Sequence, residues 1–151
     1  MADWPSFNEA GDLPVGVLPA SLADVLAEFG EGSAQRRAVG RRLARIHELA
    51  TATRSVRRFV IYGSFVTSKL DPNDVDIFLV MEDDFDFPAV PPEQRLVFDH
   101  MSAHNALGAS VFWVRRVAAL GGEESAIRDW MHKRDGSLRG VVEVVDDHES
   151  S

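Results

Sequence analysis

Residues 60–81 read VIYGSFVTSKLDPNDVDIFLVM: an apolar run, a polar spacer and a second apolar run. The first run is rich in β-branched and aromatic residues and ends at Gly63-Ser64, and the second opens with Asp74 and Asp76. Runs of this composition, bounded by Gly, Asn and Pro, are typical of β-strands. Because residues two apart on a strand share a face, Asp74 and Asp76 are expected to lie side by side where a buried strand begins.

Two neighbouring carboxylates repel each other, and an unpaired carboxylate in an apolar strand costs free energy. A divalent cation removes the repulsion, and Mg²⁺ prefers oxygen ligands of this kind. Gly63 lets a ligand approach the backbone closely, and Ser64 starts a short helix or turn whose N–H groups can bind phosphate. The segment therefore predicts a site for a nucleoside triphosphate and its metal. The alternative is that Asp74 only caps a turn.

The same residues resemble the signature of the nucleotidyltransferase superfamily, which includes DNA polymerase beta and the minimal nucleotidyltransferases. That signature is Gly-Ser, a spacer of this length, and Asp-x-Asp opening an apolar strand. Residues 65–67 and 72–74 resemble a short bacterial nucleotidyltransferase-like group, and so do Leu13-Pro14 and residues 139–142, more distantly.

The resemblance implies roles for individual residues. Gly63 and Ser64 would hold the triphosphate, and Asp74 and Asp76 would be catalytic and bind Mg²⁺ or Mn²⁺. It implies transfer of a nucleoside monophosphate from an NTP, with ATP as the expected donor, to a hydroxyl of a protein, RNA or small molecule. A toxin–antitoxin or defence context, with a protein partner or an RNA acceptor, is implied as well. Lys69 is a further candidate for phosphate binding, and a solvated lysine is the alternative.

Active members of the superfamily usually add a third carboxylate from a neighbouring strand. The next predicted strand, residues 110–114, offers only Ser110 in that place. Glu143, within a run of valines, is the candidate for the third catalytic carboxylate, and a solvent-facing residue on an edge strand is the alternative. Without a third carboxylate, the expected function is a catalytically degenerate module that binds a nucleotide or a protein.

Hydrophobic periodicity over the whole chain predicts one α/β (α+β) domain. We expect a small mixed sheet of about four strands, with helices packed mainly on one face. The expected strands are residues 56–62, 75–81, 110–114 and 138–145, and the expected helices are residues 21–30, 33–50 and 92–108 and a helix that begins at Glu123. The expected organisation is an irregular N-terminal arm (1–20), a nucleotidyltransferase-like domain (21–146) and a disordered tail (147–151).

The composition limits the classes of partner. The chain has 151 residues, a formal net charge of −8 and no cysteine. An acidic chain is not expected to present a broad DNA-binding surface. An arginine cluster in residues 36–45 is interpreted as a solvated helix face, with a local basic patch as the alternative. No secretory signal or membrane span is evident in the sequence, so we expect a cytoplasmic protein.

Overall fold

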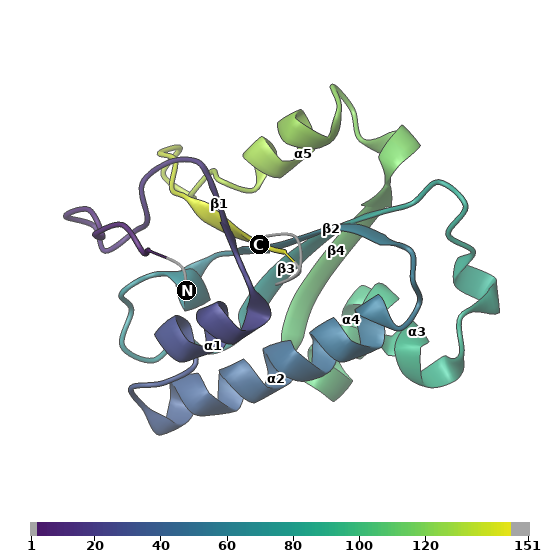
Figure 1. The fold of residues 1–151 in the computed structure, drawn as a ribbon, viewed down its shortest axis with the longest axis horizontal. Coiled ribbons are helices and arrows are strands. Elements are labelled where there is room, and N and C mark those ends of the chain that lie inside the picture. Colours follow the sequence, from purple (N-terminus) through teal and green to yellow (C-terminus); the bar gives the residue numbers. More distant parts are fainter. Residues whose placement is uncertain (1–2, 146–151) are drawn as a thin grey trace.

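A computed structural model describes residues 3–145 of the chain. They form one mixed sheet with helices on both faces (Figure 1). The strands are β1 (Val17–Ala20), β2 (Val56–Tyr62), β3 (Val75–Met81), β4 (Ala109–Arg115) and β5 (Val141–Val144). Their order across the sheet is β1-β5-β2-β3-β4. The pairs β1–β5 and β3–β4 are parallel, whereas β2 is antiparallel to both of its neighbours.

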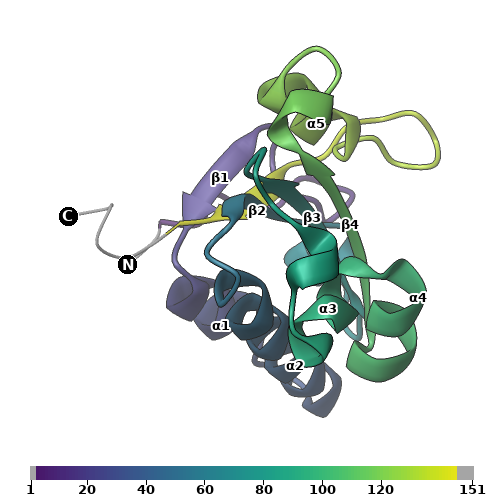
Figure 2. The ribbon, with the colours of Figure 1, turned by 90° about the vertical axis from the view of Figure 1, so that its right-hand side faces the viewer.

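The helices cover the two faces of the sheet unequally. They are α1 (Leu22–Phe29), α2 (Ala34–Thr51), α3 (Pro92–Phe98), α4 (His100–Ser102) and α5 (Glu123–Asp129). Figure 2 shows α1 to α4 on one face and α5 alone on the other. The predicted fold class is therefore confirmed, with five strands instead of about four. In the described part of the chain, none of these helices is both long enough and apolar enough to cross a membrane.

The interior strand β3 separates two hydrophobic clusters. Ile77, Leu79 and Met81 pack toward α1–α4, whereas Phe78 and Val80 pack toward α5. This alternation follows from the two-residue period of a strand. A strand that is covered on both faces reads as a continuous apolar run, as the sequence does here. By the same alternation, Asp76 lies on the α5 face of the sheet.

The two N-terminal helices begin at serine caps. The Ser21 hydroxyl accepts a hydrogen bond from the Asp24 N–H (3.1 Å), and the Ser33 hydroxyl accepts one from the Arg36 N–H (3.0 Å). Such caps satisfy N–H groups that have no partner inside the helix. The apolar residues of α2 recur at steps of three and four and are fully buried: Val39, Leu43, Ile46 and Ala50.

Part of the stretch that was expected to be an irregular arm belongs to the sheet. Strand β1 pairs in parallel with β5, with Val17 opposite Val141. The sequence VLPA did not suggest a strand because Pro19 cannot donate a ladder hydrogen bond. Proline is tolerated here because β1 is an edge strand. Leu13, upstream of β1, is also buried. The expected tail, residues 147–151, lies outside the described residues.

The helix that was expected over residues 92–108 is interrupted. Asp99 has extended backbone angles (φ −111°, ψ 113°), and its side chain accepts a hydrogen bond from the Met101 N–H. A π-helical turn (Ala103–Leu107) then follows α4. The break changes the phase of the helix, and Met101 and His104 are exposed.

Candidate functional site

Asp76 lies at the centre of a small group of polar side chains on the α5 face of the sheet. It is paired across β2 with Tyr62 and across β4 with Ser110. Burial and the nearby charge of Asp74 raise the pKa of Asp76 to about 6, while Arg139 and a hydrogen bond with Ser110 oppose that rise. The pKa is raised because a desolvated carboxylate beside a second one resists ionisation.

Asp74 contributes to the same group. Burial raises the pKa of Tyr62, and the charges of both Asp76 and Asp74 raise it further. The two carboxylates therefore act on the same hydroxyl, and the charge of Asp74 acts on Asp76. Two carboxylates within electrostatic reach are the type of donor set that suits a hard divalent cation.

Gly63 packs directly against Asp76. Its backbone (φ 83°, ψ −164°) lies in a region that is almost restricted to glycine. A Cβ atom at this position would lie 2.1 Å from Oδ2 of Asp76. Glycine is therefore required at position 63 for two reasons: the backbone angles exclude other residues, and the Asp76 carboxylate occupies the space that a side chain would need. The two halves of the sequence motif, 13 positions apart, meet in space.

Ser64 begins a 3-10 turn (Ser64–Val66) and not a longer helix. Its carbonyl accepts hydrogen bonds from the N–H (3.2 Å) and the hydroxyl (2.7 Å) of Thr67. A single turn of this kind has little helix dipole, so the phosphate affinity that was expected from a helix N-terminus is reduced. Ser64 itself is half-buried beside Gly63.

A cleft of about 400 Å³ opens next to Gly63 and Asp76. Its floor includes Tyr62 and Trp130, whose rings pack at a centroid distance of 4.7 Å. The remaining lining comes from the segment that leads into β5: His132, Lys133, Arg134, Asp135 and Arg139. The cleft is thus lined by the Asp76 carboxylate and by a mainly cationic wall formed by the segment 132–139.

The cationic wall is fixed in place by Asp12. This carboxylate is 3% exposed and forms ion pairs with Lys133 Nζ (2.7 Å) and Arg139 Nη1 (3.3 Å). Sequence reasoning missed Asp12, Lys133 and Arg134 as site residues. The run of basic residues from Lys133 to Arg139 was a usable signal, whereas Asp12 lies more than 120 positions away and offered none.

Lys69 lies away from this cleft. It is exposed and lines a different hollow, together with Phe7 and Phe29. Its carbonyl accepts a hydrogen bond from Arg36. A role for Lys69 in binding phosphate at Gly63 therefore has no support in the geometry.

Glu143 is engaged elsewhere. Its two carboxylate oxygens accept hydrogen bonds from Nε (2.6 Å) and Nη2 (2.7 Å) of Arg58. Glu143 lies opposite Val60 in the sheet, two positions along β2 from Tyr62, the partner of Asp76. In residues 3–145 no group of three or more His, Asp or Glu side chains could hold a metal ion. Glu143 therefore does not complete the Asp74–Asp76 pair in this structure.

Replacing Glu143 by glutamine is expected to lower the free energy of unfolding by about 1–3 kcal/mol, because the half-buried Arg58 loses its charged partner. Urea unfolding measures this loss. Glu124→Gln is the matched control: Glu124 also binds Arg58, but it is largely exposed, so the expected loss is below about 0.5 kcal/mol. An unchanged stability of Glu143→Gln, together with weaker ligand binding in the Asp76 cleft, would contradict this structural role.

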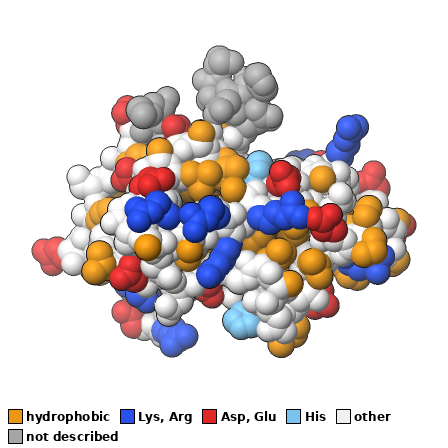
Figure 3. Space-filling model, turned by 90° about the horizontal axis from the view of Figure 1, so that it is seen from below, with side chains coloured by type: hydrophobic (Ala, Val, Ile, Leu, Met, Phe, Trp, Pro, Cys, Tyr) orange, Lys and Arg blue, Asp and Glu red, His pale blue; other side chains and the backbone are white. Residues whose placement is uncertain are grey.

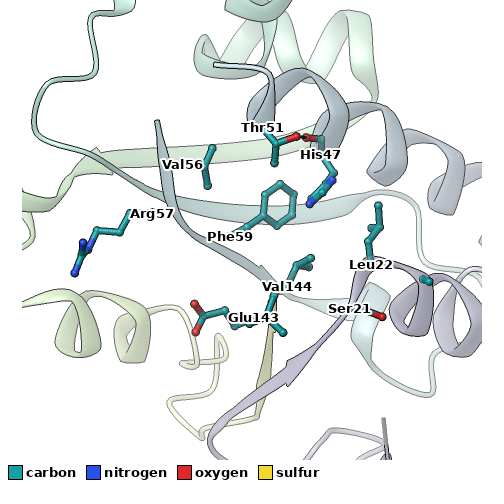
Figure 4. A pocket seen from close by; sticks show the side chains of 11 residues that line it. Ser21, Leu22, His47, Thr51, Val56, Arg57, Phe59, Glu143 and Val144 are labelled. Atoms are coloured by element: carbon teal, nitrogen blue, oxygen red, sulfur yellow. Dashed lines mark hydrogen bonds between the residues drawn. The ribbon is translucent and has the colours of Figure 1, made fainter. Parts of the chain in front are cut away.

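A larger hollow, about 500 Å³, lies between the sheet and the ends of α1 and α2 (Figure 4). Several of its polar groups already have partners. The Thr51 hydroxyl donates a hydrogen bond to the His47 carbonyl (2.7 Å). Glu143 forms an ion pair with Arg58, and Arg57 forms one with Glu123. Because these groups satisfy one another, this hollow is a weaker candidate for a site than the Asp76 cleft.

Comparisons with known proteins give one result. Neither the curated proteins nor the solved structures contain a match to this chain. Residues 5–145 match a protein family that is described as a family of unknown function, and this match spans β1 to β5 and every residue of the Asp76 cleft. The chain is therefore a member of this family of unknown function (DUF6932).

Proposed function

We propose that the Asp76 cleft binds a nucleoside triphosphate with Mg²⁺ and that the protein transfers the nucleoside monophosphate to a hydroxyl. The observation that carries the proposal is the contact between Gly63 and Asp76 in the lining of a cleft that also has a cationic wall. The resemblance of residues 60–81 to nucleotidyltransferases points to the same activity.

Asp74 and Asp76 fit a divalent cation. Asp74 and Asp76 are close enough for the charge of one to raise the pKa of the other. They would hold Mg²⁺. When bound, this ion would neutralise phosphate charge and activate a hydroxyl. Gly63 leaves the space that the Asp76 carboxylate needs.

The cationic wall suits the phosphates. Lys133 and Arg139 are held by Asp12, and Arg134 is exposed at the rim with no hydrogen bond or ion pair to any residue within 3–145. Arginine binds phosphate oxygens in a bidentate manner. A cleft of about 400 Å³ is within the usual size range for small-ligand sites.

The proposed reaction joins the acceptor oxygen to the α-phosphorus and breaks the bond to the β-phosphate, so that pyrophosphate leaves and the hydroxyl proton is lost to solvent. The chain contributes orientation and charge. Arg134 and Arg139 bind the departing phosphates, while Tyr62 and Trp130 close the floor of the cleft against water. We propose a hydroxyl of a protein or of RNA as the acceptor and the cytoplasm as the compartment.

A second candidate function is nucleotide binding without turnover. It is favoured by Ser110, which occupies the β4 position directly opposite Asp76. A serine there cannot supply the third negative charge that two metal ions would need. The carboxylate pair alone still suits one metal ion and its nucleotide.

One experiment separates the two candidates. The protein is incubated with Mg²⁺, α-labelled nucleotides and a cell lysate, and macromolecules are examined for label. Label on a protein or RNA, with release of pyrophosphate, supports the transferase. Calorimetric binding of Mg-ATP with no label on any acceptor supports the binding module, and the absence of binding for all four nucleotides contradicts both.

Arg134→Ala is expected to weaken Mg-ATP binding about tenfold, because one charge-assisted phosphate contact is lost. The free energy of unfolding should change by less than about 0.5 kcal/mol, since Arg134 is exposed. Calorimetric titration and urea unfolding measure the two effects. Arg128→Ala, at an exposed arginine of α5 outside the cleft lining, is the control and should leave the affinity unchanged. Equal affinities for both variants would count against a phosphate site at this wall.

A further inference from the structure

The spacer between the two halves of the motif is held by helix α2. After the turn at Ser64–Val66 the chain has no regular structure until β3. Three side chains of α2 nevertheless donate hydrogen bonds to its carbonyl groups. Gln35 Nε2 donates to Pro72 (3.0 Å), and Arg42 Nη1 donates to Asn73 (3.3 Å). The third side chain, Arg36, makes most of the contacts.

Arg36 binds four carbonyl oxygens at once. Nη1 donates to Phe29 (3.0 Å) and Phe65 (2.9 Å), and Nη2 donates to Thr67 (2.8 Å) and Lys69. Three of these four acceptors belong to the spacer. The guanidinium also lies over the Phe65 ring, 5.7 Å from its centroid. Buried backbone carbonyl groups in a loop need such donors, because the loop has no strand pairing or helix to satisfy them.

Burial of Arg36 is costly, and no ion pair with a carboxylate offsets it. The residue is 8% exposed and forms no ion pair with any of residues 3–145. Desolvation lowers the pKa of Arg36, against a weaker opposing effect from Asp71. A buried cation whose hydrogen bonds all go to carbonyl groups indicates that those contacts organise the loop.

Its neighbours on the helix behave differently. The sequence grouped Arg36 with four other arginines as a solvated face, and exposed members of that group lie at steps of four residues: Arg37, Arg41 and Arg45. Figure 3, which views the molecule from the side of α2, shows Lys and Arg side chains in a row across this surface. Arg36 instead points inward, which makes Arg37 a matched control.

We infer that Arg36 is a positioning residue that sets the span between the Gly63–Ser64 turn and the Asp74–Asp76 pair. Loss of the guanidinium hydrogen bonds would let residues 66–74 move. The Gly63–Ser64 turn and the Asp74–Asp76 pair would then no longer be held in one relative position. The role of Arg36 in ligand binding rests on the proposed function, whereas its role in ordering the loop does not. Lysine cannot replace it, since an ammonium has three donors and no planar fork for four carbonyls.

The test compares Arg36→Lys with Arg37→Lys in the full chain. Hydrogen–deuterium exchange follows the amides of residues 66–74, and calorimetry follows the affinity for Mg-ATP. For Arg36→Lys we expect loop exchange to rise about tenfold while β2 and β3 stay protected. The Kd for Mg-ATP should rise about tenfold or more, as for other residues that orient a ligand site. Arg37→Lys should match the wild type in both.

A general loss of stability is separated from positioning by Glu143→Gln, which destabilises the fold at a distance from the loop. If Glu143→Gln weakens Mg-ATP binding as much as Arg36→Lys does at equal stability, the positioning role is overturned. Wild-type exchange rates in the loop of Arg36→Lys also overturn it. If the wild type binds no Mg-ATP, the proposed function fails, and the exchange rates alone decide the role of Arg36.

Gln35→Ala is the second variant, in case Arg36→Lys does not fold. It removes the bond to the Pro72 carbonyl without leaving a buried charge. Faster exchange at residues 71–74, with the rest of the chain unchanged, supports the conclusion that α2 fixes the spacer. Unchanged exchange at those residues contradicts it.

Discussion

Asp76→Asn is expected to weaken Mg-ATP binding roughly 100-fold or more and, at the same time, to stabilise the ligand-free protein at pH 8. The first effect follows because an amide is a poor substitute for an ionised metal ligand. The second follows because the carboxylate is desolvated and lies beside Asp74, so that its ionised form is disfavoured in the folded state. Replacement of a residue with a purely structural role would not weaken ligand binding while raising the stability of the ligand-free protein.

The stabilisation depends on pH in a defined direction. Folding raises the pKa of Asp76 from 3.8 to about 6. The folded state therefore binds its proton more tightly than the unfolded state does. The resulting contribution to stability is complete below pH 3.8 and is lost as the pH rises through 6, and its size is about 2–3 kcal/mol. Asparagine has no such dependence, so its advantage over wild type should grow by about that amount between pH 4 and pH 8.

Urea unfolding at a series of pH values, without metal or nucleotide, measures the difference between Asp76→Asn and wild type. Asp135→Asn is the control, because Asp135 also lines the cleft but is exposed and hydrogen-bonded to Ser137. The control should show neither the gain at pH 8 nor the large loss of Mg-ATP affinity. A variant at Asp76 that binds Mg-ATP like the wild type would remove this carboxylate from the site.

Gly63→Ala is expected to destabilise the fold by about 3–5 kcal/mol and to abolish Mg-ATP binding. A non-glycine residue in this backbone region costs about 1–3 kcal/mol. The added Cβ would also lie 2.1 Å from Oδ2 of Asp76, so the carboxylate must move or the turn must shift. Overpacking of this kind typically adds about 1–3 kcal/mol.

The two contributions can be separated with a second glycine. Gly136 also has a positive φ (87°), but a Cβ there would meet no atom within 4 Å. Gly136→Ala should therefore lose only the conformational part, about 1–2 kcal/mol. In the double variant Gly63→Ala/Asp76→Ala, removal of the carboxylate should restore part of the stability lost in Gly63→Ala. A cost for Gly63→Ala no greater than that for Gly136→Ala would mean that Asp76 does not pack against this turn.

Local sequence was sufficient for the central part of the site. Gly63 directly follows β2 and Asp76 lies in β3, the next strand along the chain, and the composition of residues 60–81 indicated both strands and the turn between them. The period of two then placed Asp76 on a definite face of the sheet. The apolar stripe of α2 and the serine caps of α1 and α2 were predictable for the same reason, because each depends on contacts within a few residues.

Periodicity indicates which face a residue occupies but not which residue lies opposite it. The partner of Glu143 depends on β5 pairing with β2, and that pairing placed Arg58 beside it. Arg36 matched an exposed arginine row by sequence, yet the carbonyls that draw it inward belong to a loop about 30 residues away.

The amino-acid sequence by itself determined the mixed α and β class, the strands β2 and β3 and the proximity of Gly63 to Asp76, because these depend on short-range pattern and turn chemistry. Only the tertiary structure decided the cationic wall, where Asp12 reaches Lys133 and Arg139 across more than 120 residues. The physical reason is that strand order and long-range ion pairs are set by how separate elements pack, and no local period encodes that choice.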